Sequence, residues 1–396
     1  MDLAAGPEVV TLGCRLNIAE SETIRALIAG RDIVVVNSCA VTNAAVRETR
    51  VAIRRVRRRR PDAEIVVTGC AAQIDPAGFA AMPEVTRIVG NLDKLAPANW
   101  GAVAAASPAF AGHARAFVEV QNGCDHRCTF CAIPFGRGAS RSVPAGAVIE
   151  RIAALVDAGH REVVLTGVDV TSYGSDLPGT PALGSLVERI LTHVPALERL
   201  RLSSLDAVEI DDRLFDLVTG EPRVMPHLHL SLQAGSDMIL KRMKRRHTRA
   251  DAIALVARVK AKRDVAIGAD LIAGFPTEDA AMFADTLAIL DDCDVVHPHV
   301  FPYSPRAGTP AARMPQVAPD VVRERAARLR AAGNARRRDW LASLIGSEQA
   351  VLVERSGDRG HAAGFAEVRL PSAPPRSIQR VRVTAATGTF LEGMIV

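Results

Sequence analysis

Three short apolar segments near the start of the chain each end in a cysteine. EVVTLGC ends at Cys14, DIVVVNSC at Cys39 and EIVVTGC at Cys70. Their β-branched residues are typical of buried parallel strands, and helical patterns lie between them. Strands that alternate with helices predict a doubly wound parallel sheet, in which the strand ends share one edge. We therefore expect the three cysteines to lie close together, although three separate buried thiols would give the same pattern.

A second group of cysteines lies in one loop, NGCDHRCTFCAIPFGRG. Cys124, Cys128 and Cys131 have the spacing C-x3-C-x2-C. Structural zinc sites usually have four ligands in two pairs, and no second pair lies nearby in the sequence. Thiolates also hold iron–sulfur clusters, and three ligands to four irons leave one iron free to bind a small molecule. The spacing therefore favours a reactive cluster over a structural metal site.

The region around this loop has the pattern of a βα barrel. Six strand-like segments alternate with helical ones, at 117–121, 161–169, 198–206, 227–233, 265–276 and 295–304. A complete barrel of this kind has eight strands, so six predict a partial (β/α)6 barrel. Its active site should lie at the C-terminal ends of the strands, where the cysteine loop follows the first strand.

The composition changes from about residue 338, where short alternating segments with Gly and Pro turns begin. They predict a small C-terminal β-barrel. We therefore divide this α/β chain into three domains, 1–105, 110–337 and 338–396.

Bulk composition limits the class of protein. The chain has 396 residues, of which 48% are hydrophobic and 23% charged, as in ordinary globular proteins. It has no run of about 18 apolar residues and no apparent signal peptide, so we expect a cytoplasmic protein with no membrane partner. The seven cysteines are expected to be thiols or metal ligands. The net charge of +5 gives a slight preference for a polyanionic partner.

Several motifs carry a resemblance to a known family. The C-x3-C-x2-C spacing, with Phe130 before the last cysteine, resembles the signature of radical S-adenosylmethionine (SAM) enzymes. TLGCRLNIAESE, VVNSCAVT and TGCAAQ ahead of such a loop resemble the methylthiotransferase family over nearly the whole chain. The resemblance implies two 4Fe–4S clusters. Cys124, Cys128 and Cys131 would hold the cluster that cleaves SAM to a radical.

The same resemblance implies that Cys14, Cys39 and Cys70 hold a second cluster, which carries the sulfur to be inserted. Cys293 is left as an ordinary buried thiol. No catalytic side chain is assigned beyond these ligands.

The family includes three substrate classes. SSLDAVEID, HLHLSLQAGSDMILKRMKRRHT and FPYSPRAGTPAARMPQ resemble the subgroup that methylthiolates C2 of N6-threonylcarbamoyladenosine beside the tRNA anticodon. The alternatives within the family are isopentenyladenosine in tRNA and an aspartate of a ribosomal protein. An alternative of another class is a non-catalytic zinc- and RNA-binding protein.

Residues near the expected strand ends are candidates for contacts with SAM. They are Thr166, Gly167, Asp169, Gln233, Gly268 and Gly274. Gly167 has an equally good explanation as the glycine of a tight βα turn.

Two arginine-rich segments, 47–61 and 241–249, are candidates for contacts with tRNA phosphates. The residues chosen are Arg57, Arg58, Arg59, Arg60, Arg245 and Arg246. The alternative is a solvated helix face. The C-terminal segment resembles the RNA-binding TRAM domain. An electron donor and a sulfur source are implied as further partners, and a monomer is expected.

Overall fold

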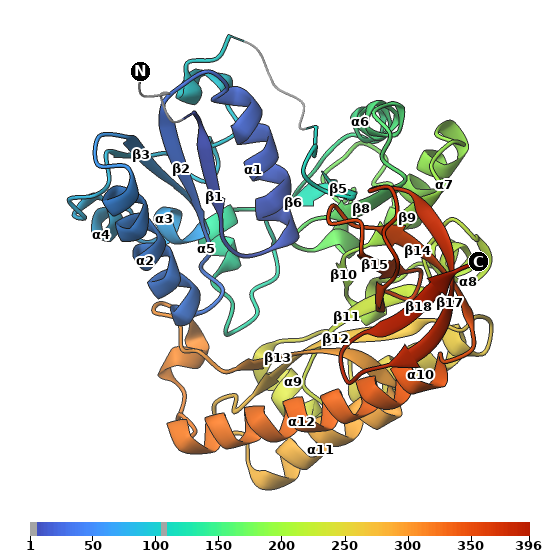
Figure 1. The fold of residues 1–396 in the computed structure, drawn as a ribbon. Helices are drawn as coiled ribbons and strands as arrows, with labels where there is room; N and C mark the ends of the chain where they lie inside the picture. The colour runs from blue at the N-terminus through green and yellow to red at the C-terminus, as the bar shows by residue number, and fades with distance from the viewer. Residues whose placement is uncertain (1–5, 104–108) are drawn as a thin grey trace.

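The computed structural model describes residues 6–103 and 109–396, which form three connected parts (Figure 1). The first part is a parallel sheet with the strand order β1-β2-β3-β4. Its strands are β1 (Glu8–Thr11), β2 (Ile33–Ser38), β3 (Glu64–Gly69) and β4 (Arg87–Ile88).

Helices cover both faces of this sheet. Successive strand residues point to opposite faces, and the packing follows that alternation. Val35 of β2 packs in one cluster with Ile24 of α1 (Arg15–Leu27). Val34 packs in another with Ile53 of α2 (Asn43–Arg59). The short helices α3 (Cys70–Ile74) and α4 (Pro76–Ala80) follow β3. The predicted sheet with helices on both faces is confirmed.

The second part is a partial barrel of parallel strands. Its strands are β5 (Arg115–Glu119), β8 (Glu162–Thr166), β9 (Arg199–Leu202), β10 (Ser204–Leu205), β11 (His227–Gln233), β12 (Ala266–Ala273) and β13 (Val295–Pro302). β9 pairs with β8 and β10 with β11, so these two are halves of one strand interrupted at Ser203. Six strand positions result, which confirms the predicted (β/α)6 arrangement.

Helices pack around this barrel. They are α6 (Ala145–Asp157), α7 (Leu183–His193), α8 (Asp212–Gly220), α9 (Asp237–Met243), α10 (Arg249–Lys260) and α11 (Ala280–Asp292). The cysteine loop contains α5 (Ile133–Arg137) and lies between the small paired strands β6 (Gln121–Asn122) and β7 (Arg141–Ser142).

The third part is a closed barrel with the order β14-β15-β16-β18-β17, as predicted. Its strands are β14 (Glu348–Val353), β15 (Arg359–Ala362), β16 (Glu367–Arg369), β17 (Ile378–Ala386) and β18 (Leu391–Ile395). The long helix α12 (Pro319–Ser343) leads into it, so the expected boundary at 337/338 lies inside a helix (Figure 1).

The C-terminal barrel covers the end of the central barrel at which the strands begin. Arg115, the first residue of β5, pairs with Glu354 at 2.7 Å. Arg199, the first residue of β9, donates to the carbonyl of Ala350 at 2.8 Å. The other end of the central barrel is thereby left for the cysteine loop. Within the described residues, no helix is long and apolar enough to cross a membrane.

Candidate cluster and cofactor site

The three N-terminal cysteines lie at the carboxyl edge of the sheet, as predicted from the strand pattern. Cys14 directly precedes α1, Cys39 directly follows β2, and Cys70 begins α3 straight after β3. Gly13, with φ of 101°, brings the first loop onto Cys39: a β-carbon added to Gly13 would lie 2.9 Å from the Cys39 sulfur. We call Cys14, Cys39 and Cys70 the N-terminal cysteine set.

Cys124, Cys128 and Cys131, the loop cysteine set, follow the first barrel strands. The loop is held in place by Thr129. The Thr129 backbone N–H donates to Met243 O at 3.1 Å, and its hydroxyl donates to Arg242 O at 2.8 Å. Both acceptors belong to α9, so the loop is fixed over the end of that helix.

The two cysteine sets face each other across the seam between the N-terminal sheet and the central barrel. Helix α5 packs onto Cys70, since a β-carbon added to Gly136 would lie 3.1 Å from the Cys70 β-carbon. Asn91 joins the two sides: its Nδ2 donates to Gly136 O at 2.5 Å and to the Cys70 sulfur at 3.7 Å.

The thiols fit a thiolate-bound cluster at both places. Burial raises the pKa of Cys39 to about 11, and the nearby Cys14 and Cys70 add to the effect. Burial likewise raises the pKa of Cys131 to about 11 and that of Cys124 to about 12. Thiols gathered this closely resist ionisation until a metal neutralises their negative charge. Each set offers three cysteine sulfurs as ligands, which fits a 4Fe–4S cluster with one iron left open.

Groups that donate hydrogen bonds surround the sulfurs. Arg245 points a guanidinium nitrogen at the Cys128 sulfur, 3.7 Å away, and the backbone N–H of Ile133 donates to the Cys131 sulfur at 3.4 Å. Hydrogen bonds to sulfur are one of the means by which proteins set the potential of an iron–sulfur cluster.

A buried ionic network closes the seam. Glu20 of α1 lies 2.5 Å from Lys94 and 2.8 Å from Arg137, the last residue of α5. All three residues are at most 2% exposed. Although burial favours the neutral acid, the two cations lower the pKa of Glu20 to about 2. Asn17 and Asn122 accept the remaining Arg137 hydrogen bonds, at 2.5 and 3.0 Å.

This network was not predicted from the sequence. The signal was present in TLGCRLNIAESE, where Asn17 and Glu20 occupy positions three residues apart on the buried face of α1. Polar residues on such a face need buried partners, but their spacing does not say which.

Of the residues proposed to contact SAM, Asp169 approaches the loop cysteine set. Its Oδ2 is 3.9 Å from the Cys124 sulfur and 2.8 Å from His126 Nε2. Thr166 and Gln233 are the last residues of β8 and β11, as expected. A β-carbon on Gly167 would lie 2.7 Å from Gln121 O, which explains this glycine by packing alone.

The two glycines of the GADLIAGFPTE segment differ from their expected placement. Gly268 is the third residue of β12 rather than its end, and a β-carbon there would lie 2.5 Å from His229 Nδ1. Gly274 does follow β12, with φ of 74°, but it packs against Val322 of α12. Contacts within the protein therefore explain both glycines.

Most of the arginines proposed to bind RNA have partners within the chain. Arg57 donates to three backbone carbonyls, including that of Ala63 at 3.0 Å. Arg59 pairs with Glu8, and Arg60 pairs with Glu8 and Asp32. Arg58 is exposed. Backbone hydrogen bonds and salt bridges at the C-terminal end of α2 thus explain three of these four arginines without RNA.

The second arginine segment lies beside the cysteine loop. Arg245 pairs with Asp206 at 2.7 Å as well as approaching Cys128. Arg246 pairs with Glu209. The position of Arg245 suits the cluster site rather than an RNA surface. A basic segment in the sequence does not show which of its side chains contact other parts of the protein.

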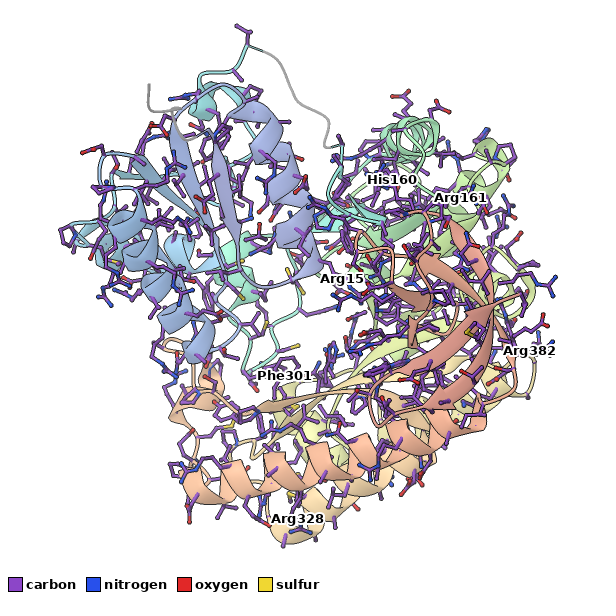
Figure 2. The ribbon with its side chains drawn as sticks, viewed as in Figure 1. Arg15, His160, Arg161, Phe301, Arg328 and Arg382 are labelled. Carbon is purple, nitrogen blue, oxygen red and sulfur yellow. The ribbon has the colours of Figure 1, made fainter. Side chains whose placement is uncertain are left out.

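Arg15 was also missed. It begins α1 directly after Cys14, and Figure 2 shows it between the N-terminal sheet and the central barrel. Burial, together with repulsion from Arg115 and Arg201, lowers the pKa of Arg15 to about 10. The side chain is still a cation at neutral pH.

Comparison with known proteins agrees with this geometry. Residues 118–290 match the model of the radical SAM superfamily, and residues 8–90 match that of the uncharacterized protein family UPF0004. A threonylcarbamoyladenosine tRNA methylthiotransferase of Rickettsia prowazekii is 46% identical, covering 92% of this chain and 91% of that protein. A protein with the same name from Bacillus subtilis is 37% identical over 81% of this chain and 78% of its own length.

This chain belongs to the radical SAM methylthiotransferase family. Family membership confirms the predicted enzyme class and cofactors, SAM and two 4Fe–4S clusters. It does not favour a non-catalytic zinc- and RNA-binding protein.

Two further proteins place this methylthiotransferase among its relatives. A tRNA-2-methylthio-N(6)-dimethylallyladenosine synthase of Cereibacter sphaeroides is 32% identical, covering 97% of both chains. Among solved structures, the radical SAM methyltransferase TsrM of Kitasatospora setae aligns with a TM-score of 0.56 over 78% of each chain, at 15% identity. That likeness shows the shared fold.

Proposed function

We propose that this methylthiotransferase modifies C2 of N6-threonylcarbamoyladenosine in tRNA, and that it does so in the cytoplasm as a monomer. The observation that carries the proposal is the 46% identity, over 92% of the chain, to a protein named for that substrate. The relative named for dimethylallyladenosine is 32% identical at similar coverage, so that substrate is the second candidate. The opposed cysteine sets supply the site for the chemistry.

The cluster ligands follow from the two cysteine sets. The loop cysteine set would hold the cluster that binds SAM, and the N-terminal cysteine set the cluster that carries sulfur. When bound, these groups supply the radical and the sulfur, which no side chain can provide. Residues 1–105 and 110–337 would each hold one cluster.

The protein's own residues position these groups and limit water. Cys39 and Cys70 are buried, which shields their side of the N-terminal site from water, whereas Cys14 is exposed. The pair Glu20–Arg137 keeps α5, and with it the cysteine loop, against the N-terminal sheet. Arg245 places a positive charge beside the Cys128 sulfur.

For tRNA contacts we propose a revised set of arginines on α2. Arg47, Arg55 and Arg58 are exposed, and at 3.6 residues per turn they share one side of the helix. None of the three pairs with a described acidic residue, so their charges are available to phosphates. We call them the α2 arginine row. Residues 338–396 would add backbone contacts, and an electron donor and a sulfur source would act with the enzyme.

Nucleoside analysis of tRNA tests the function. Cells that lack the gene should lose the 2-methylthio derivative of threonylcarbamoyladenosine and accumulate its precursor. The wild-type gene should restore the derivative, whereas a Cys70→Ala variant should not. Loss of the 2-methylthio derivative of isopentenyladenosine instead would assign the second candidate substrate.

A further inference from the structure

Arg15 reaches from the cysteine edge of the N-terminal sheet into the interior of the central barrel. Its guanidinium carbon lies 5.6 Å from the ring centroid of Phe365, a residue of the C-terminal barrel. Arg115, the first residue of β5, and Arg201, within β9, lie over the same ring at 5.0 and 4.9 Å. Arg15 therefore joins the cluster site to the barrel interior, and it is only partly buried there.

The neighbouring arginines have acidic partners. Arg201 pairs with Glu162 at 2.9 Å, and Arg199 pairs with the same carboxylate at 3.6 Å. Arg115 pairs with Glu354 at 2.7 Å. These carboxylates are therefore engaged.

Asp270, a further acid whose charge acts on Arg15, is engaged by histidines. His229 Nε2 lies 3.0 Å from its Oδ1, and His299 Nδ1 lies 3.4 Å from the same oxygen. Across residues 6–103 and 109–396, no carboxylate lies within ion-pair distance of Arg15, and its contact with Phe365 is a cation–π interaction.

This region has one positive charge in excess. The four arginines named above outnumber the three carboxylates, Glu162, Asp270 and Glu354. A cation withdrawn from bulk water is usually paired with an anion. The described residues supply no such anion to Arg15, and the adjoining Cys14 is exposed, so an anion from solution can approach on that side.

We propose that Arg15 binds the carboxylate of the threonyl group of the substrate nucleoside and thereby selects that nucleoside. The inference rests on the proposed function, because threonylcarbamoyladenosine carries a carboxylate whereas the isopentenyl group is an uncharged hydrocarbon. A guanidinium can bind a carboxylate through two parallel hydrogen bonds. Since Arg15 adjoins Cys14, a carboxylate held there keeps the attached adenine near the cysteine sets.

The test compares two anticodon stem-loops that differ by one charge. One carries threonylcarbamoyladenosine, and the other carries its methyl ester. Binding to the reconstituted holoenzyme is measured by fluorescence anisotropy without reductant, and kcat/KM is measured with reductant. The proteins are wild type, Arg15→Gln, Arg15→Lys and Arg161→Gln. Arg161 is a matched control, because it is an exposed arginine that pairs with Glu198 at 3.3 Å, far from the seam (Figure 2).

We expect wild type and Arg161→Gln to prefer the acid over the ester by about 10- to 100-fold, the range for hydrogen bonds to a charged group. Arg15→Gln should bind the acid as weakly as wild type binds the ester, while its affinity for the ester stays unchanged. Arg15→Lys should keep part of the preference. The iron content of the Arg15 variants should equal that of wild type, which shows that the clusters are still assembled.

Other outcomes would overturn the inference. If Arg15→Gln keeps the preference for the acid, the carboxylate is bound elsewhere. If it weakens acid and ester equally, Arg15 contacts an RNA phosphate or supports the fold. If wild type instead modifies an isopentenyladenosine stem-loop and leaves the threonylcarbamoyl one unmodified, the proposed function itself fails, which is a separate result.

Discussion

Glu20→Gln should destabilise the N-terminal sheet while changing its shape very little. The substitution removes the only described ion-pair partner of two buried cations, Lys94 and Arg137, which Glu20 pairs with at 2.5 and 2.8 Å. Removing one partner of a buried ionic group costs about 3–5 kcal/mol. Burial already lowers the pKa of Lys94. Loss of its proton would therefore limit the cost to the lower end of that range.

The pKa of Glu20 gives a second measure of the same interaction. A folded-state pKa of about 2, against 4.5 for a free glutamate, corresponds to about 3 kcal/mol. Because the folded pKa is the lower one, this stabilisation is complete above pH 4.5 and is lost as the pH falls towards 2. The difference in stability between wild type and Glu20→Gln should therefore shrink over that interval.

Trp100 provides the assay. The protein has two tryptophans, so Trp340→Phe leaves Trp100 as the only one. Trp100 is fully buried and its indole N–H donates to Lys94 O at 2.7 Å, so its fluorescence reports on this network. Urea unfolding followed at Trp100 avoids treating a protein of three parts as one two-state unit.

The control is Glu48→Gln, which removes an exposed glutamate from α2 and should change the unfolding free energy by no more than about 0.5 kcal/mol. If Glu20→Gln unfolds within about 1 kcal/mol of its parent, the network does not stabilise the seam and the reasoning is refuted. A gap that stays constant between pH 4.5 and 2 would contradict the assigned pKa.

Two further predictions concern the clusters and tRNA. A variant with the N-terminal cysteine set replaced by alanine should keep about four of about eight irons. It should still form 5′-deoxyadenosine but insert no sulfur. If this variant cannot cleave SAM although its loop cluster is intact, the two clusters do not have the separate roles proposed here. Replacing the α2 arginine row by glutamine should reduce the slope of log affinity against log salt by about 2 to 3 without changing which adenosine is modified. An unchanged slope would mean that the α2 arginine row is a solvated helix face that does not contact tRNA phosphates.

The sequence predicted the placement of the cysteines because that placement follows from strand geometry. In a parallel sheet, residues that end successive strands share an edge, so Cys39 and Cys70 had to be neighbours. The partial barrel and the small C-terminal barrel followed in the same way from the spacing of apolar segments.

Contacts between distant side chains could not be predicted in this way. Glu20 and Arg137 are separated by 117 positions, and no local pattern pairs them. Arg57 and Arg245 looked like surface charges, but one satisfies backbone carbonyls and the other lies beside a cysteine. Composition records the charge of a side chain, whereas its partner depends on the tertiary fold.

The seam also makes the loading of the clusters independent of the distance between them. Each cysteine set comes entirely from one part of the chain, so under the proposed ligand assignment neither cluster needs a ligand from the other part. The distance between the clusters, by contrast, depends on contacts such as Asn91 to Gly136. A substitution at that contact should therefore give an enzyme that is fully loaded with iron and slow only in delivering sulfur. Iron analysis would then not detect substitutions at the seam, whereas the amount of methylthiolated nucleoside in tRNA would fall.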